Sequence, residues 1–407
     1  MKKVLMCVST LAATCSMTNA LAQSNMKVYG QLDAVLYQTS QGGKSATSFG
    51  SSSDGASFWG LTGNEDMGGG LNASFDLRSE ITMMTGQAAS TSTSATNAGQ
   101  TSTAAVTQNS ITNAGDKPAF FNRNAHIKLD QSGVGSLTIG RQADVWWAAT
   151  GELNNATGNN GGFNNLIATQ LNSGSFLSTV SGQANSTVIT NFAGSASAAG
   201  VNINPSYIGV TSGFMGGFAY TTPNIAGFSG SYQIGVPKIS YNDAGAANNG
   251  AAWTLRYDGM GLSVRLGNSY KNDYQGNKAW SQDLIGASYT LDKWKFTLAQ
   301  NQMKLVGSAV GDNSTVIGGG VFYSLSNALT LNFGYGTLKD TTNSANQFKQ
   351  TTVNVYYKLS PRTAIFAGIH NGVNSGATKM TAVYGGNATD TLGATVNAYT
   401  MGMKHNF

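Results

Sequence analysis

The sequence predicts an all-β fold, a 16-stranded antiparallel β-barrel that spans a membrane. Three observations predict it. Apolar and polar residues alternate in many segments, and the connections between these segments are either short or long. Beyond the N-terminal region, no stretch approaches the ~18 to 20 consecutive apolar residues that a spanning helix needs. A membrane protein with this sequence can therefore be built only from strands.

The N-terminal region has the pattern of a secretory signal peptide. Two lysines at positions 2 and 3 precede a short apolar run, and an A-x-A cleavage site ends at Ala22. The run is too short for a transmembrane anchor. We therefore expect residues 1–22 to be a signal peptide and residues 23–407 to form one barrel domain.

The composition excludes several classes of protein. Both cysteines lie in the expected signal peptide, so a large exported chain must be held together without disulfides. The mature chain keeps 21 of the 23 basic residues against 18 acidic ones, a balance too mild to indicate binding to nucleic acid. Charged residues are 10% of the chain, against about a quarter in ordinary globular proteins.

The alternation identifies the strands one by one. In residues 71–81, the odd positions are mostly apolar and the even positions are polar, and residues 329–335 repeat the pattern. Each segment has roughly the ~10 residues that cross a bilayer at a tilt. Sixteen such segments begin near Met26, Ser57, Gly70, Phe120, Gly135, Tyr207, Phe228, Ala251, Gly261, Gln282, Trp294, Thr315, Ala328, Phe348, Arg362 and Ala394.

The connections sort into two sets. The tight ones are residues 65–69, 132–134, 258–260, 292–293, 326–327 and 360–361. The long, polar ones include residues 82–119, 143–205, 239–250 and 371–393. Short connections on one side and long ones on the other are typical of periplasmic turns and external loops.

The last nine residues predict how the barrel closes. From Tyr399 to Phe407, every second residue has an apolar or aromatic side chain, with Lys404 on the opposite face. A terminal strand of this kind can pair with the segment from Met26 to Tyr37 and remove both open edges of the sheet.

Seven segments resemble the general porins of Gram-negative bacteria, especially the betaproteobacterial type. They are residues 28–33 (VYGQLD), 58–63 (FWGLTG), 65–71 (EDMGGGL), 121–123 (FNR), 137–142 (LTIGRQ), 220–223 (YTTP) and 401–407 (MGMKHNF). The resemblance spans nearly the whole mature chain.

This resemblance implies an exported protein of the bacterial outer membrane. Proteins of the family are homotrimers of 16-stranded barrels, so the expected partners are two further copies, outer-membrane lipid and small hydrophilic solutes. A final aromatic residue in such proteins is read by the outer-membrane assembly machinery, and here the resemblance assigns that signal to Phe407.

The resemblance also implies that the third external loop, residues 143–205, folds inward and narrows the pore. Its apolar content is too high for a disordered loop. Constriction loops of the family usually carry acidic residues that face a basic wall. This chain departs from that pattern, because Asp144 and Glu152 are followed by no charged residue from Leu153 to Pro237.

Strand parity predicts which charges line the pore. Arg or Lys on the lipid face costs ~2 to 4 kcal/mol at mid-bilayer, so charged residues should point to water. The predicted pore-lining residues are Lys27, Asp33, Asp76, Arg78, Glu80, Lys128, Arg256 and Arg265. We expect Lys27, Arg78, Lys128 and Arg265 to form the basic wall. Arg123 and Arg141 break parity, which indicates strand ends or a bulge.

These residues predict a water-filled channel for passive diffusion of small hydrophilic solutes and ions. A neutral loop beside a basic wall predicts weak selectivity or a mild preference for anions. Two alternatives stay open. One is a substrate-specific outer-membrane channel, and the other is a surface adhesin or receptor built on a plugged barrel.

Catalytic motifs are missing from the sequence. The three histidines, His126, His370 and His405, accompany no recognisable serine motif. There is no His/Cys cluster for zinc, no P-loop, no dinucleotide fingerprint and no EF-hand spacing. We therefore expect no enzyme activity, no metal and no cofactor.

Overall fold

The computed structural model describes residues 25–51, 53–86, 120–154, 166–167, 214–236, 250–272, 278–305, 313–341, 343–376, 378, 380, 382 and 393–407. The expected signal peptide, residues 1–22, lies outside these residues. The described strands are β1 (Asn25–Gln41), β2 (Lys44–Ser51), β3 (Phe58–Asp66), β4 (Leu71–Glu80), β5 (Asn124–Gln131), β6 (Gly135–Ala143), β7 (Phe214–Thr221), β8 (Phe228–Gly235), β9 (Gly250–Gly259), β10 (Leu262–Asn272), β11 (Lys278–Leu291), β12 (Trp294–Leu305), β13 (Asn313–Ser324), β14 (Leu329–Asp340), β15 (Gln347–Lys358), β16 (Thr363–Ser375) and β17 (Thr395–Asn406), with the helix α2 (Val145–Glu152).

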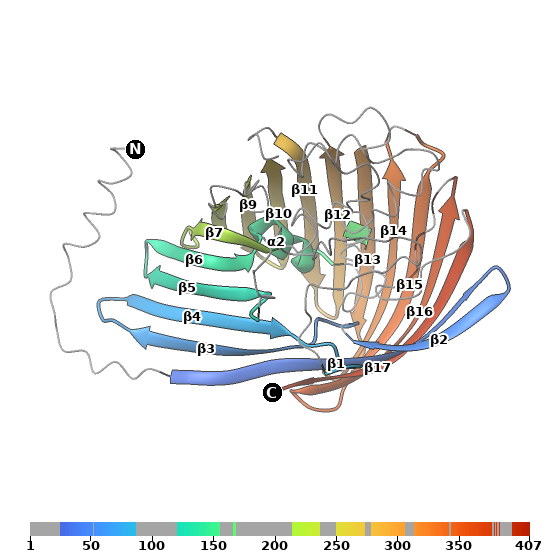
Figure 1. The fold of residues 1–407 in the computed structure, drawn as a ribbon, viewed down its shortest axis with the longest axis horizontal. Helices are drawn as coiled ribbons and strands as arrows, with labels where there is room; N and C mark the ends of the chain where they lie inside the picture. The colour runs from blue at the N-terminus through green and yellow to red at the C-terminus, as the bar shows by residue number, and fades with distance from the viewer. Residues whose placement is uncertain are drawn as a thin grey trace, which may run out of the picture.

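The strands form one closed antiparallel sheet (Figure 1). Except for β2 and β3, neighbours in the chain pair with each other, and β17 pairs with β1 from Gln31 opposite Asn406 to Gln41 opposite Val396. The ring therefore has the all-β, 16-place architecture that the alternation predicts.

One strand was not predicted. Both β2 and β3 run antiparallel to β1, with β2 on residues 34–41 and β3 on residues 25–31. They share one place in the ring, so 17 strands fill sixteen places. The pattern missed β2 because residues 44–51 are small and polar apart from one phenylalanine, and they show no alternation.

The closing seam depends on a glycine. Gly30 N donates to the Phe407 carbonyl at 3.1 Å, and Phe407 N donates to the Gly30 carbonyl at 3.0 Å. The Phe407 ring lies over Gly30, where an added Cβ would overlap the ring and come within 2.6 Å of the Phe58 carbonyl oxygen. The aromatic end of the chain can be seated only because position 30 has no side chain.

The two faces of the strands differ as parity predicts. On β17, Met401 and Met403 are 63% and 50% exposed, whereas the intervening face carries Thr400, which is 5% exposed. The outer surface of the ring is therefore apolar. The inner face is mostly polar, but it also holds an apolar cluster that includes Met215, Leu284, Met303, Val316, Leu338 and Phe348.

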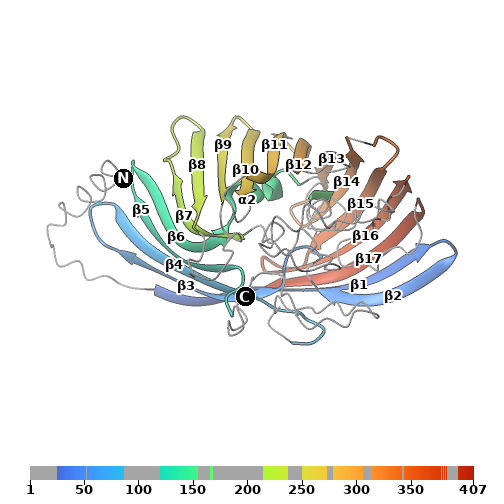
Figure 2. The ribbon, with the colours of Figure 1, turned by 45° about the horizontal axis from the view of Figure 1, so that its top comes forward.

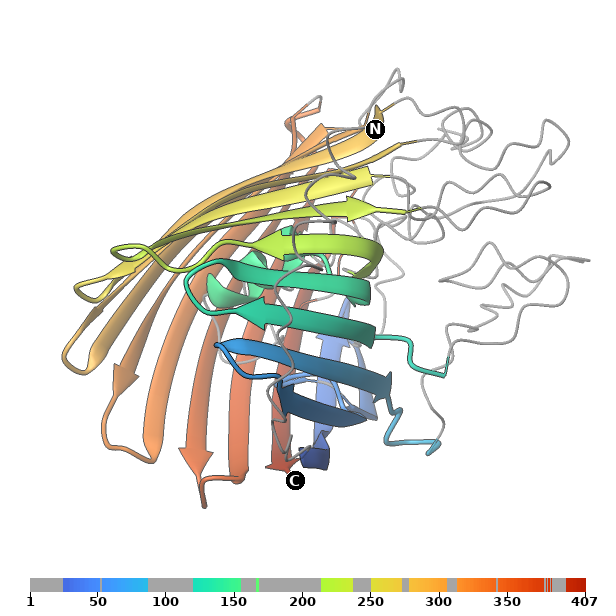
Figure 3. The same cartoon turned by 90° about the vertical axis from the view of Figure 1, so that its left-hand side faces the viewer.

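Apart from the turn of Gly42 and Gly43 between β1 and β2, the tight turns gather at one end of the ring (Figure 3). Met260 and Gly261 join β9 to β10, and Asp292 and Lys293 join β11 to β12. Met260 and Asp292 adopt φ angles of 51° and 50°, the left-handed region that two-residue hairpins require. No helix among the described residues is long and apolar enough to cross a membrane.

We predict that Gly30→Ala destabilises the seam by about 1–3 kcal/mol, the cost of inserting atoms into a packed contact. Purified protein would be unfolded in urea and its midpoint compared with that of the parent. Gly230→Ala, also in a strand, is the control, because its Cβ would meet the flexible Leu255 side chain at 3.3 Å and make an ordinary contact with the Thr254 carbonyl oxygen at 3.6 Å. Equal midpoints for the two variants would contradict the seam assignment.

Candidate functional site

The helix α2 lies inside the ring, against β8, β9 and β10 (Figure 2). The Asp144 carboxylate caps it, accepting from Trp146 N at 2.9 Å and from Ser269 Oγ at 2.8 Å. Val145 N donates to Gln233 Oε1 at 3.0 Å. Asp144 is 4% exposed. The structure therefore makes Asp144, which the sequence assigned to the constriction loop, a buried anchor of the helix.

Inward-facing glycines make room for the apolar side chains of this loop. At three positions an added Cβ would meet a side chain of the loop instead of open space. Gly286 and Gly336 are seats, because an added Cβ would overlap Leu153 and Leu166, whereas at Gly267 it would make only ordinary contact with Trp146, at 3.5 Å. These loop side chains join the apolar cluster on the inner wall. The described part of residues 143–205 is thus packed against the lumen wall.

The last residue of α2 meets a group of charges on β9, β10 and β12. Arg256 Nη2 lies 2.7 Å and 2.8 Å from the two Glu152 carboxylate oxygens, and Arg265 Nε lies 2.5 Å from one of them. Arg265 Nη2 also donates to Asp258 at 2.7 Å. Lys295 interacts electrostatically with Arg265 and Glu152. The structure therefore brings together three predicted site residues, Glu152, Arg256 and Arg265.

A second group of charges lies on β1, β3, β4 and β5. The Arg78 guanidinium carbon lies 4.5 Å from the centroid of the Phe58 ring, and Arg78 Nε donates to Tyr29 Oη at 3.0 Å. Tyr29 Oη also donates to the Asp76 carboxylate, which pairs with Arg78 at 3.2 Å. Asn124 Nδ2 donates to the same carboxylate at 2.5 Å. Arg78 and Asp76 are thus held in a fixed arrangement.

The two arginines that break parity lie next to this group. Arg123 Nη2 pairs with Glu80 at 2.9 Å, and Arg141 Nε donates to the Asn122 carbonyl at 2.7 Å. Arg141 follows Gly140, whose φ of 123° lies in the left-handed region that favours glycine. A local distortion of β6 therefore accompanies the break in parity.

Asp33 has the predicted inward direction but is not exposed to water. Its exposed fraction is 0%. Its carboxylate accepts from Ser53 N at 3.1 Å and from Asp54 N, and its own N–H donates to Ser57 Oγ at 2.9 Å. Lys404 Nζ pairs with Asp54 at 2.5 Å. Asp33 therefore holds the segment between β2 and β3 inside the ring and does not line the open lumen.

The remaining two predicted pore residues are more exposed. Lys27 is exposed and, among the described residues, forms no ion pair. Lys128 pairs with Asp130 at 3.4 Å, with side-chain exposures of 40% and 49%. Neither residue reaches the Glu152 group.

Sequence reasoning missed a further segment that folds against the inner wall. Met380 N donates to Asn374 Oδ1 at 2.6 Å, and Gln350 Nε2 donates to the Ala382 carbonyl at 2.5 Å. Met380 belongs to the same apolar cluster as Phe348 and the third-loop side chains. Residues 371–393 are mostly polar in sequence, so the alternation gave no signal of this contact.

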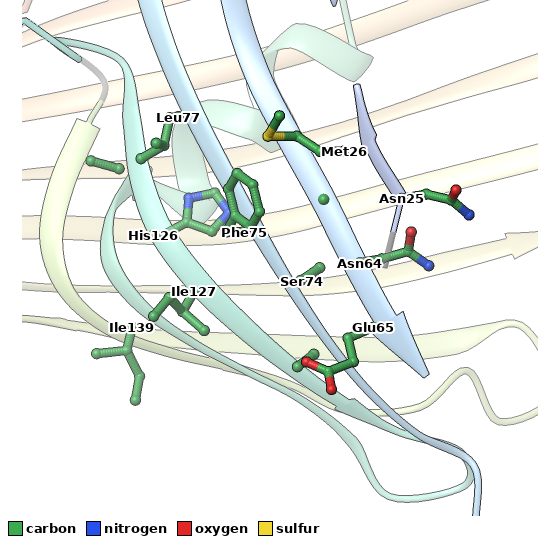
Figure 4. Close-up of a pocket in the computed structure, with 13 residues that line it drawn as sticks. Asn25, Met26, Asn64, Glu65, Ser74, Phe75, Leu77, His126, Ile127 and Ile139 are labelled. Carbon is green, nitrogen blue, oxygen red and sulfur yellow. The ribbon is translucent and has the colours of Figure 1, made fainter. Parts of the chain in front are cut away.

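A hollow of about 780 Å³ lies on the outside of the ring (Figure 4). Met26, Phe75, Ile127 and Ile139 line it, and Met26 and Ile127 are 70% and 61% exposed. These side chains share the outward, apolar phase of β1, β4, β5 and β6. The hollow is therefore not part of the lumen.

Comparison with known proteins agrees with this geometry. The family model of the Gram-negative porins matches residues 8–377. The chain belongs to the Gram-negative porin family. The porin is accordingly an outer-membrane barrel that forms a water-filled channel. Comparison with curated protein sequences gave no match.

Solved structures share the fold of the porin at low sequence identity. An anion-selective porin from Comamonas acidovorans is 21% identical, with a TM-score of 0.66 over 95% of this chain and 100% of that one. OmpT of Vibrio cholerae in its trimer form is 12% identical, with a TM-score of 0.53 over 94% and 99% of the two chains. OmpF of Salmonella typhi in complex with daunomycin is 14% identical, with a TM-score of 0.53 over 94% and 97%.

We predict that Gly286→Val lowers the single-channel conductance of the porin. A Cβ at position 286 would lie 2.6 Å from Leu153 Cδ1 and 2.7 Å from Ala299 Cβ, so the end of α2 must move away from the wall and into the lumen. Gly319→Val is the matched control, because its nearest contacts would be ordinary ones at 3.4 Å and 3.5 Å. Conductance in planar bilayers is the measurement. An unchanged conductance for Gly286→Val would show that Gly286 is not needed to hold Leu153 and the end of α2 against the wall.

Proposed function

We propose that the porin is a general diffusion channel with a mild preference for anions, assembled as a homotrimer after removal of residues 1–22. The lumen charges carry this proposal. Of the two acidic residues of the third loop, Asp144 is buried as a helix cap and Glu152 is held by two arginines. Neither is free to attract cations.

At the Glu152 end of α2 the cations outnumber the carboxylates. Arg256, Arg265 and Lys295 are accompanied by Glu152 and Asp258. Among the described residues, Lys295 forms no ion pair, and its ammonium lies 5.6 Å from the centroid of the Phe322 ring. A permeating anion therefore meets a net positive wall, while the loop beside it supplies no further negative charge.

Two further observations support the finer parts of the proposal. The similar structures include an anion-selective porin and an outer-membrane protein in trimer form, each at low identity. Phe407 lies at the closing seam, at the end of the last strand, and the family resemblance assigns the assembly signal to this residue. Conductance lost in three equal steps would support the homotrimer, and single steps would contradict it.

A specific channel remains a second candidate because of one observation. Tyr356 and Phe366 are register partners on the inner face of β15 and β16. Phe366 is buried in an apolar cluster, whereas the Tyr356 ring beside it is partly exposed and can stack on a flat solute. Liposome swelling with neutral solutes of graded size separates the candidates. A sharp limit on the size of the solutes that enter supports a general pore, and preference for one solute supports a specific channel. No swelling supports a plugged adhesin or receptor.

We predict that Lys295→Gln reduces the anion preference. The reversal potential would be measured in a KCl gradient, and we expect the parent value to have the anion-selective sign and to shrink as salt rises. The Debye length, over which charges are screened, shortens from ~10 Å at 0.1 M salt to ~3 Å at 1 M. Lys304→Gln is the control for net charge, because Lys304 pairs with Asp283 on the outer face. A cation-selective potential in the parent would refute the proposal.

A further inference from the structure

Arg256 and Arg265 lie directly opposite each other on neighbouring strands. They are register partners on β9 and β10, and both side chains point into the lumen. Like charges directly opposite in a sheet are destabilising. Arg265 is nearly buried, with 6% side-chain exposure, which increases the need for a counter-charge. Asp258 already pairs with Arg265 Nη2 at 2.7 Å, so the two arginines together still lack one counter-charge, and a carboxylate or another oxyanion between the guanidinium groups supplies it.

The Glu152 carboxylate fills this position. Three N–H···O contacts of 2.5–2.8 Å join its two oxygens to the two guanidinium groups. Planar guanidinium groups match carboxylate and phosphate in this manner. The arrangement is that of an oxyanion site whose ligand is a side chain of the same chain.

Helix stability does not explain why Glu152 is there. It is the last residue of α2, where the helix dipole disfavours a negative charge. The helix is held independently at its other end by Asp144 and Ser269, and along its length by Trp146 against Gly267. Neutralising Glu152 should therefore leave α2 in place.

We propose that Arg256 and Arg265 form a binding site for the carboxylate or phosphate group of a permeating solute, and that Glu152 occupies this site as an internal, exchangeable ligand. The inference rests on the proposed anion preference and specifies where it acts. Lys295 is the third cation beside the site.

Exchange with Glu152 would keep solute binding weak. A tethered ligand competes at an effective concentration of the order of millimolar or more. A free oxyanion therefore displaces Glu152 only briefly, and this suits a channel, in which a solute must be able to leave as well as bind. Removing the Glu152 charge should expose the site and lengthen the stay of the solute.

Single-channel current in constant KCl would be recorded while inorganic phosphate or acetate is added. For Glu152→Gln we expect phosphate to reduce the current at a concentration about tenfold lower than in the parent, because charge-assisted hydrogen bonds become available to it. Acetate should act in the same direction but more weakly. Asp283→Asn, which removes one negative charge from the outer face, should behave like the parent.

The double variant Glu152→Gln with Arg256→Gln should lose the added sensitivity to phosphate. Equal sensitivity of Glu152→Gln and the parent would overturn the inference, as would equal sensitivity of the single and double variants. A larger conductance in Glu152→Gln without any phosphate effect would also overturn it, because Glu152 would then be a structural tie alone. The KCl reversal potential of the parent tests the proposed function separately.

Discussion

Every other feature of the porin depends on the closure of its hydrogen-bonded ring. A backbone group without a partner costs several kcal/mol in hydrocarbon, so a sheet in a membrane cannot have an edge. The seam between β1 and β17 removes the last edge, and the mutual backbone hydrogen bonds of Gly30 and Phe407 end it. The apolar outer surface and the polar inner surface follow, because alternate residues of a closed sheet have only these two directions.

Closure also gives the ring an inner surface that is only partly covered by water, because parts of the chain pack against it. Three segments fold against that surface: the connection between β2 and β3, the start of the third loop, and the described residues of the last loop. Each is held differently. The first depends on Asp33 and Lys404, the second on Asp144 and the glycine seats, and the third on backbone hydrogen bonds to Asn374 and Gln350. The lumen is thus narrowed by three segments, and inward-facing side chains of the strands help to hold them in place.

The sequence predicts those parts of the molecule in which one physical rule acts alone. A period of two residues locates sixteen places in the ring, and it gives the inward direction of Arg78, Arg256 and Arg265, because only the pleat decides direction. Parity does not say what covers an inward side chain. Asp33 obeys it and is nevertheless buried, since its carboxylate accepts backbone hydrogen bonds from Ser53 and Asp54. β2 was missed because its pairing with β1 comes from backbone hydrogen bonds, which small polar residues allow but do not reveal. The glycine seats were equally hidden, because a glycine that makes room for a distant ring looks the same in sequence as one in a turn.

The Glu152 group shows how a pore can be selective with few charges. A wall of unpaired arginines would bind an oxyanion too tightly to release it, and a wall of fully paired arginines would not attract one. A counter-charge on the loop, and not on the wall, gives a binding strength between these two extremes. A solute oxyanion can then replace the loop carboxylate while the barrel stays closed. The neutral sequence that follows Glu152 fits this arrangement, because further acidic residues nearby would repel the solutes that the arginine pair attracts. The departure from the acidic constriction loop of the family and the inward pairing of Glu152 thus have one electrostatic explanation.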